Sequence, residues 1–193
     1  MTCLIRAGAE VCPVSVPVKA QITRYGSLFA VAMALGLGLG GCSPALNWRD
    51  VTLGNIALTL PCKPDHAQRK VSLGGESLEM DMVGCEADGA LFAVSRLGLP
   101  KALSADQLQA HWQTATLQQM KAQGDPVLAP AGTRANALAL RMLNASGQAT
   151  DGRAIQARLA WVAAGPDVYH FAVYAARITP EMAEPFFDGA KAR

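Results

Sequence analysis

Three histidines, His66, His111 and His170, are the side chains of this sequence best suited to moving protons near neutral pH. The sequence contains neither an HExxH zinc motif nor a G-x-S-x-G turn for a nucleophilic serine. A Ser-His-Asp triad assembled in space stays an open alternative, because serines and aspartates are numerous. We interpret His66 as a loop residue, His111 as a partly exposed helix residue and His170 as a packed strand residue. We therefore predict no catalytic residue.

Three carboxylates that are close in sequence, Asp81, Glu86 and Asp88, could together bind a calcium ion. Calcium takes about six to eight oxygen ligands, and this segment lacks the regular spacing of an EF-hand loop. Turn chemistry explains the Asp88-Gly89 pair better. The GLGLGG run at residues 36–41 matches GxGxxG, but that fingerprint requires a preceding strand and a following helix. We predict no metal site and no cofactor.

The apolar stretch at residues 28–39 has the length and setting of a secretory signal. Its 12 residues are too few for a membrane-spanning helix, which needs about 20, but they suit the apolar region of a signal peptide. Lys19 and Arg24 precede the stretch and two glycines follow it. We predict that residues 1–41 are a signal peptide, within which residues 1–17 are a mis-assigned start.

The residues that end this segment, Leu39-Gly40-Gly41-Cys42, resemble the lipobox of bacterial lipoproteins. The resemblance implies diacylglycerol transfer to the Cys42 thiol, cleavage between Gly41 and Cys42, and acylation of the freed amine, for example with palmitate. Each buried methylene contributes about 0.8 kcal/mol, so three acyl chains would hold the protein permanently in a membrane. Ser43 follows the cysteine, which in that family implies the periplasmic face of the outer membrane rather than retention in the inner membrane.

The expected mature chain is a neutral domain. Removing 41 of 193 residues leaves 152, which suits one domain that buries about 70% of its unfolded surface. The removed part carries three of the 17 basic and one of the 15 acidic residues, so no net charge is left. This balance excludes nucleic acid as a partner, and the lack of a polybasic run argues against binding to anionic lipid surfaces.

Two cysteines, Cys62 and Cys85, stay in the mature chain beside the lipidated one. The lipobox implies an oxidising compartment, where two thiols favour a disulfide. Gly74-Gly75 predicts a two-residue hairpin turn with Leu73 opposite Glu76, and this register brings Cys62 within a short adjustment of Cys85. The spacing excludes a CxxC redox pair, and two thiols are too few for a zinc site. We predict a structural disulfide.

Hydrophobic periodicity predicts a single α+β domain at residues 55–193 behind a lipidated tether at 42–54. A capping box of Ser104 and Gln107 starts one helix, and Thr179-Pro180 starts another. The expected strands lie at 55–61, in a hairpin at 69–82, and at 90–97, 137–144, 153–164 and 168–176. This order predicts an antiparallel sheet of about six strands in two meanders (β-β-β-α-β-β-β-α), covered by helices.

The pattern resembles the Mog1/PsbP-like fold, whose bacterial members include small lipoproteins. The resemblance rests on IALTLPCKP at 56–64, on the paired final strands and on PFFDGA at 185–190. It implies an accessory or assembly role rather than catalysis, and it transfers no site residue.

We therefore expect a non-catalytic binding or assembly module of the cell envelope. Its partner would be another envelope protein, which would bind near the loop at 62–65 or the turn at 165–167. The alternative is a small envelope enzyme or ligand-binding lipoprotein with a pocket between sheet and helix. That alternative requires a polar cluster, for instance His170, Tyr174 and Arg158, to converge in one concave site.

Overall fold

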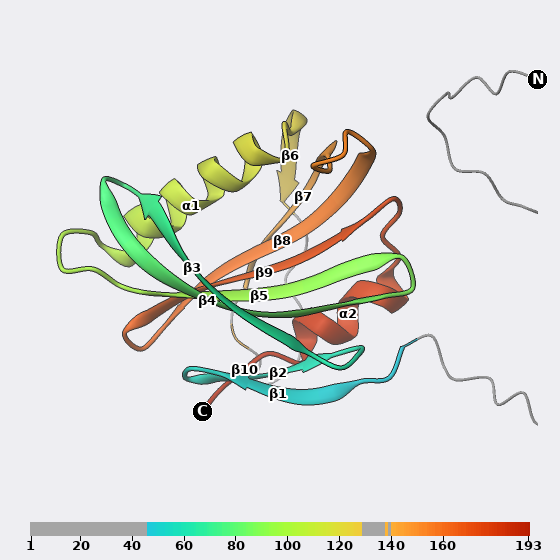
Figure 1. Cartoon of the computed structure of the whole chain (residues 1–193), viewed down its shortest axis with the longest axis horizontal. Coiled ribbons are helices and arrows are strands. Elements are labelled where there is room, and N and C mark those ends of the chain that lie inside the picture. The colour runs from blue at the N-terminus through green and yellow to red at the C-terminus, as the bar shows by residue number, and fades with distance from the viewer. Residues whose placement is uncertain (1–45, 129–137, 139) are drawn as a thin grey trace, which may run out of the picture. The chain divides into compact units, whose positions relative to one another are not determined.

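The structure of the chain, a computed structural model, describes residues 46–128, 138 and 140–193. The expected signal peptide, the cleavage site after Gly41 and Cys42 itself lie outside these residues. The described part is α+β, as predicted, and its elements are labelled in Figure 1. The helices are α1 (Ala105–Gln119) and α2 (Pro180–Asp188); the strands are β1 (Arg49–Leu53), β2 (Ile56–Leu60), β3 (Asp65–Leu73), β4 (Glu76–Ala87), β5 (Ala90–Gly98), β6 (Gln123–Leu128), β7 (Arg141–Gln148), β8 (Ala154–Ala164), β9 (Asp167–Ala175) and β10 (Lys191–Ala192). Within these ranges, neither helix is long and apolar enough to cross a membrane.

The strands form two antiparallel sheets. Seven strands pair in the order β3-β4-β5-β9-β8-β7-β6, and three pair in the order β1-β2-β10. The prediction of one sheet with about six strands in two meanders was therefore wrong in strand number and arrangement. The strand expected at 55–61 does not join the large sheet, because β2 pairs with β1 and with Lys191 and Ala192.

Three strands were missed because their sequences are short, polar or carry a turn signal. β1 lies within the expected tether at 42–54, and its sequence RDVTL offers only Val51 and Leu53 as apolar residues. β10 has two residues. β6 contains Asp125-Pro126; the proline is tolerated because β6 is an edge strand whose pairing with β7 is irregular.

The seven-stranded sheet carries a hydrophobic core on each face. α1 covers one face and contributes Leu108 and Trp112 to a cluster that we call the α1-side core. α2 and the three-stranded sheet cover the other face and form the α2-side core (Figure 1). The largest fully buried side chains of the α2-side core are Tyr169, Phe92, Phe171, Phe186, Ile56, Leu58 and Leu60.

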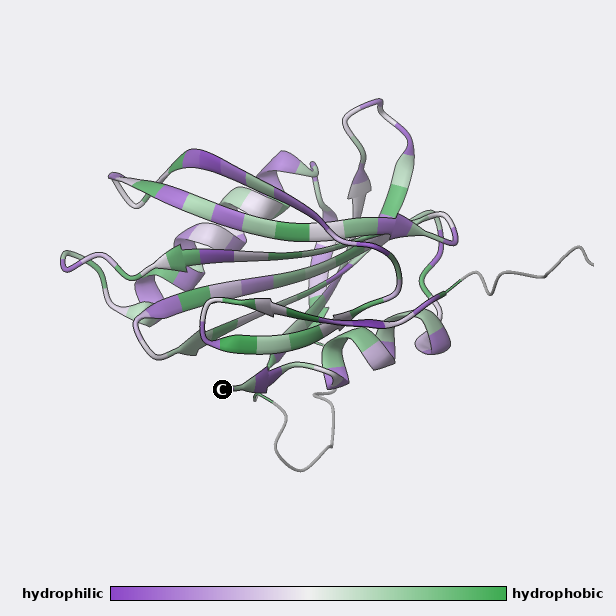
Figure 2. Cartoon of the chain, turned by 60° about the horizontal axis from the view of Figure 1, so that its bottom comes forward, coloured by the Kyte–Doolittle hydropathy of each residue, from purple (hydrophilic) through white to green (hydrophobic). Residues whose placement is uncertain are grey.

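Local sequence signals are confirmed where the interacting residues are neighbours in the chain. The β3–β4 hairpin has the predicted register, with Leu73 opposite Glu76, and both turn glycines have positive φ angles. Polar and apolar residues alternate along much of β4, whereas β3 is mostly polar (Figure 2). The Ser104–Gln107 capping box is present at the start of α1, and Thr179 caps α2. Pro185 lies inside α2, which has only nine residues.

Candidate functional site

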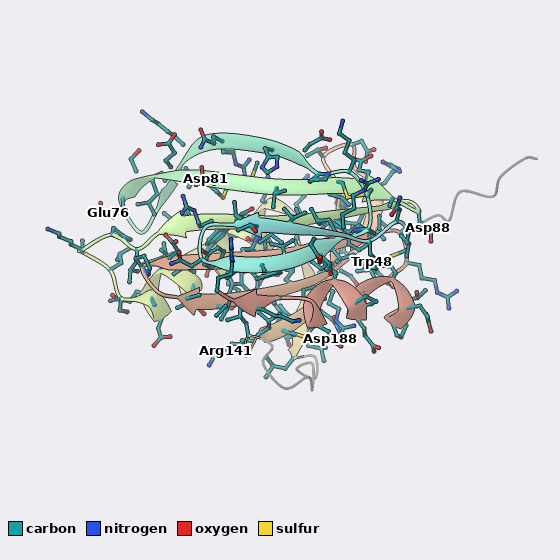
Figure 3. The ribbon with its side chains drawn as sticks, turned by 90° about the horizontal axis from the view of Figure 1, so that it is seen from below. Trp48, Glu76, Asp81, Asp88, Arg141 and Asp188 are labelled. Atoms are coloured by element: carbon teal, nitrogen blue, oxygen red, sulfur yellow. A yellow bond between two sulfur atoms is a disulfide. The ribbon has the colours of Figure 1, made fainter. Side chains whose placement is uncertain are left out.

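A groove of about 760 Å³ lies between the outer face of the three-stranded sheet and the end of α2. We call it the β1–α2 groove. In the sheet, Asp50 is opposite Thr59 and Thr52 is opposite Ala57. These pairs face outward because they alternate with buried residues such as Leu58. Figure 3 views the molecule from this side. The lining consists of Trp48, Asp50, Val51, Thr52, Ala57, Leu58, Thr59, Pro185, Asp188, Gly189, Lys191 and Arg193.

The end of α2 forms one wall of the groove by lying directly on β2. The Thr59 hydroxyl donates a hydrogen bond to the carbonyl oxygen of Pro185 at 3.3 Å. Gly189 allows this approach, because a Cβ atom there would collide with Thr59 Oγ1 and with the Pro185 carbonyl. The groove is therefore shaped by contacts between segments at opposite ends of the domain sequence.

Charged residues of both signs line the groove in separate places. Lys191 lies opposite Ala57, and the guanidinium of Arg193 donates to Thr52 Oγ1 at 3.4 Å, so the basic residues lie near the β1–β2 turn. Asp50 lies two residues before Thr52 in β1 and is opposite Thr59. Asp188 belongs to the end of α2 that contacts Thr59, so both acidic residues lie near Thr59. Two residues along a strand span about 6.6 Å. No salt bridge within the described ranges uses any of these four charged side chains.

Trp48 closes the groove where the chain enters the domain. Its ring contacts Phe92 edge-on, with ring centroids 6.4 Å apart, and it packs against the α2-side core. The side chain is only half-buried and also lines the groove. A tryptophan in this position offers an apolar surface to a ligand while its core contact keeps it in place.

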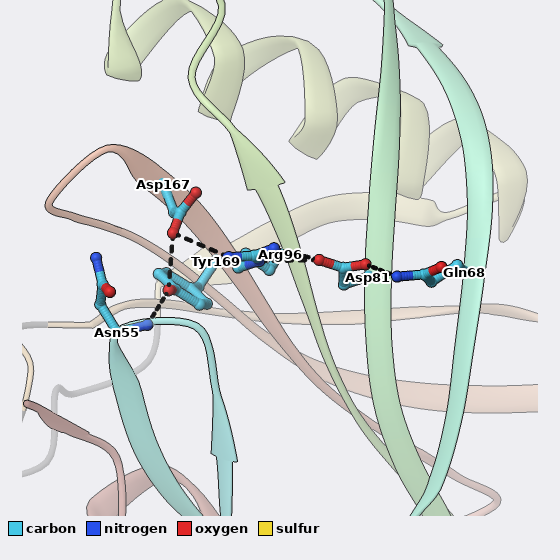
Figure 4. Close-up of polar contacts among 6 residues, drawn as sticks. All are labelled: Asn55, Gln68, Asp81, Arg96, Asp167 and Tyr169. Carbon is cyan, nitrogen blue, oxygen red and sulfur yellow. Dashed lines mark hydrogen bonds and ion pairs between the residues drawn. The ribbon is translucent and has the colours of Figure 1, made fainter.

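A separate row of polar side chains joins the two sheets (Figure 4). Arg96 on β5 donates to Asp81 through Nε at 3.0 Å and also through Nη2. Gln68 donates to the second oxygen of Asp81 at 2.6 Å, and Arg96 Nη1 lies 3.5 Å from Asp167 Oδ2. The hydrogen bonds from Arg96 lower the pKa of Asp81.

The polar row ends on the three-stranded sheet. The Tyr169 hydroxyl donates to Asp167 at 3.2 Å and accepts a bond from the backbone N–H of Asn55 at 2.9 Å. Asn55 belongs to the β1–β2 turn, so this bond ties the small sheet to β9. Burial raises the pKa of Tyr169 and keeps the phenol a donor at neutral pH. Because its charged groups are paired, we assign this row a structural role.

His170 is a packed strand histidine, as predicted. Its ring stacks on Trp161 with centroids 4.6 Å apart and contacts Trp112 at 5.4 Å. Burial lowers the pKa of His170 to about 3, so the ring is neutral near pH 7. The Nε2 atom has no hydrogen-bond partner in the described part of the chain. It lies in a close-packed aromatic cluster of the α1-side core.

The three residues named as an example of the pocket alternative's polar cluster do not converge. His170 and Tyr174 lie on the α1 side of β9, because they alternate with Phe171 and Val173 of the α2-side core. Arg158 pairs with Val173 and therefore lies on the other face. Burial raises the pKa of Tyr174 to about 12.

Arg158 interacts with α2 instead of with the two β9 residues. Its guanidinium carbon lies 5.6 Å from the centroid of the Phe187 ring. The example cluster of the pocket alternative is therefore not formed, and the register of β8 against β9 is the physical reason.

The two cysteines that were expected to pair lie at disulfide distance. The sulfur atoms of Cys62 and Cys85 are 2.00 Å apart and their Cα atoms are 6.0 Å apart. The bond joins the end of the small sheet to β4, at the edge of the α2-side core. The loop at 62–65, one of the two expected binding patches, is therefore crosslinked to the large sheet.

The other residues considered from sequence have ordinary surroundings. His66 was expected in a loop but lies in the exposed edge strand β3, and His111 is exposed on α1. Asp88 has a positive φ of 50° before Gly89, which agrees with the predicted turn. Asp81 is held by Arg96, and the described ranges contain no group of three or more metal-ligating side chains.

The comparisons with known proteins leave the site to be interpreted from its own geometry. The chain matches no protein-family model, and no curated protein matches it significantly.

Sequence reasoning missed the β1–α2 groove. Its lining residues fall in two segments, 48–59 and 185–193, that nothing in the sequence pattern joins. The sequence signal that could have indicated the groove is its four charged residues, Asp50, Asp188, Lys191 and Arg193. Taken one at a time, each of them is typical of an ordinary protein surface. The packing of α2 on β2 and the pairing of β10 with β2 bring these segments together.

Proposed function

We propose that this protein is a lipoprotein anchored through acyl chains on Cys42 to the periplasmic face of the outer membrane. There it acts as a non-catalytic binding or assembly module of the cell envelope. The observation that carries the proposal is the β1–α2 groove, with four charged side chains that make no salt bridge within the described residues. Such a groove offers specific polar contacts to a bound molecule.

The position of the groove along the chain supports the same proposal. Trp48, at its rim, follows the lipobox cysteine by six residues. An extended chain of six residues reaches at most about 22 Å. A domain tethered this closely presents its small sheet near the membrane, where other anchored envelope components would meet it.

We also propose that the domain is a variant of the Mog1/PsbP-like fold. Two observations support this: hairpin-connected antiparallel strands precede and follow α1, and a second helix with a buried Phe186-Phe187 pair ends the domain. The three-stranded sheet is the main departure from the predicted plan. Accessory and assembly roles in that family agree with a binding module.

The anchor is tested by metabolic labelling with palmitate, followed by separation of inner and outer membranes. We expect label on the protein in the outer-membrane fraction and no label on a Cys42→Ala variant. Cys62→Ser serves as the matched cysteine control and should keep the label. Unlabelled wild-type protein would refute the lipoprotein assignment.

The binding role is tested by site-specific photocrosslinking in intact cells. A benzophenone side chain at Thr52, exposed in the groove, should yield a discrete adduct. The same group at Ser77, exposed in the β3–β4 hairpin, should yield none. Equal, diffuse adducts from both positions would argue against a binding groove.

A further inference from the structure

The charge pattern of the β1–α2 groove suits a ligand that carries both charges. Lys191 and Arg193 form a basic end near the β1–β2 turn, whereas Asp50 and Asp188 form an acidic end near Trp48. The four side chains sum to zero net charge. A purely anionic ligand would gain from the two cations but would be repelled by the two carboxylates. A zwitterion with an anionic group and an ammonium can satisfy both ends.

Hydrogen-bonding capacity agrees with this pattern. Lys191 offers an ammonium and Arg193 a guanidinium, the two side chains that bind phosphate most strongly. The carboxylates of Asp50 and Asp188 accept hydrogen bonds from an ammonium group. In the described part of the protein none of the four has an ionic partner, although Arg193 makes one long bond of 3.4 Å to Thr52.

The length of the tether places the groove next to a membrane surface. Between the acylated Cys42 and Trp48 the chain can span at most about 22 Å. The polar headgroup layer on each side of a bilayer is about 5–8 Å thick. The groove therefore lies within reach of the headgroups of the bilayer that holds the acyl chains. This step rests on the proposed function.

Trp48 adds a second membrane-directed feature. Tryptophan is enriched at membrane–water interfaces, where its ring contacts the acyl boundary and its N–H stays in the polar layer. Trp48 is half-buried against Phe92 and lies at the groove wall nearest the tether.

We propose that the β1–α2 groove binds the zwitterionic headgroup of a phospholipid, with an ammonium and a phosphate as in phosphatidylethanolamine. The phosphate binds Lys191 and Arg193, and the ammonium binds Asp50 and Asp188. This contact turns the small sheet toward the bilayer and leaves the α1 side of the domain facing the periplasm. The lipoprotein is then oriented on its membrane as well as anchored to it.

The test uses the lipidated protein reconstituted in vesicles of phosphatidylethanolamine and phosphatidylglycerol. A benzophenone at Thr52 is activated by light, and the lipid adducts are identified by mass spectrometry. We expect adducts with phosphatidylethanolamine in excess of its mole fraction from Thr52, and few adducts from Ser77. Lys191→Glu combined with Arg193→Glu should lower the Thr52 yield about tenfold, the effect of losing a hydrogen bond to a charged group. Lys70→Glu with Arg69→Glu, on exposed β3, is the charge-matched control and should leave the yield unchanged.

Three outcomes would overturn the headgroup proposal. The first is an equal adduct yield from Thr52 and Ser77, and the second is a preference for phosphatidylglycerol over phosphatidylethanolamine. The third is that the Thr52 adducts formed in intact cells consist of peptide alone, without lipid. The last outcome would identify a protein ligand for the groove and would support the binding role without the headgroup. The mass of the purified protein reports acylation of Cys42 independently. If the chain is not acylated, the same crosslinking with added vesicles still decides the headgroup question while the anchor proposal fails.

Discussion

The α1-side and α2-side cores lie on opposite faces of one sheet, but they are closed in different ways. A single helix closes the α1-side core. The α2-side core is closed by α2 and by the three-stranded sheet, with the Cys62–Cys85 bond at its edge and the Tyr169–Asn55 bond tying the turn. The α2-side core also carries the β1–α2 groove on its outer layer.

The hydrogen bonding of buried polar groups separates the two faces less clearly than their covering layers do. Tyr169, in the α2-side core, has partners on both sides of its hydroxyl. Buried side-chain atoms without a hydrogen-bond partner occur on both faces in the described part of the chain: Trp161 Nε1 and His170 Nε2 on the α1 side, and Arg158 Nε on the α2 side. A buried unpaired polar group costs about 1–3 kcal/mol. The comparison teaches that the face bearing the candidate site has more covalent and interlayer ties, namely the Cys62–Cys85 bond and the Tyr169–Asn55 bond, and these ties support the groove.

The largest expected effect comes from opening the α2-side core. Phe186→Ala removes ring contacts with Phe92, Phe171 and Phe187, whose centroids lie 5.6, 5.9 and 5.0 Å away. The free energy of unfolding should fall by about 3–5 kcal/mol, measured by urea denaturation. Phe186→Leu should cost less than half of this. A loss below about 1.5 kcal/mol would show that the layer is less tightly packed than its burial indicates.

Removing the covalent brace should have the next largest effect. Cys62→Ser with Cys85→Ser opens a loop with a sequence separation of 23 and should destabilise the domain by about 3–4 kcal/mol. The measurement is chemical denaturation of the oxidised wild type and of the variant. Reduced wild type should match the variant. If reduction leaves the stability unchanged, the disulfide contributes nothing to the α2-side core.

Acid should act first on the α1-side core, through His170. Its pKa is about 3 in the folded protein and near 6.5 when unfolded, so the unfolded chain binds a proton first and stability falls as pH drops below 6.5. Between pH 7 and pH 5 the expected loss is about 2 kcal/mol, since each unit corresponds to about 1.4 kcal/mol. Protonation of Asp81 contributes only below its ordinary pKa of 3.8.

The control for this acid effect is His170→Phe, which keeps an aromatic ring between Trp112 and Trp161. Its free energy of unfolding should stay nearly constant from pH 7 to pH 5. An equally steep pH dependence in the variant would assign the acid sensitivity to another group.

The smallest expected effect is on the polar row between the sheets. Asp81→Ala removes the partner of Arg96 at a site where the arginine side chain is 33% exposed, so solvent screens the pair. The expected loss is about 1 kcal/mol, and it should shrink in 1 M salt. Gln68→Ala is the neighbouring control and should cost less. A loss above about 3 kcal/mol would mean that the row behaves as a buried ion pair.

The sequence by itself determined the features that depend on neighbouring residues. Gly74-Gly75 specified the hairpin turn and, through it, the register of Leu73 against Glu76. Ser104 with Gln107 specified the start of α1. The pairing of Cys62 with Cys85 followed from the same hairpin register. These interactions span a few residues or extend along one continuous ladder, so local pattern and turn chemistry are sufficient to predict them.

Only the tertiary structure decided which distant segments meet. β10 pairs with β2 from the other end of the domain; this pairing adds the third strand to the β1–β2 hairpin and brings Lys191 and Arg193 to the β1–α2 groove. The register of β8 against β9 placed Arg158 and His170 on opposite faces. A two-residue strand such as Lys191-Ala192 has no periodicity of its own. Its pairing is chosen by the packing of α2 against β2, where Gly189 and Thr59 meet, and no local rule contains that information.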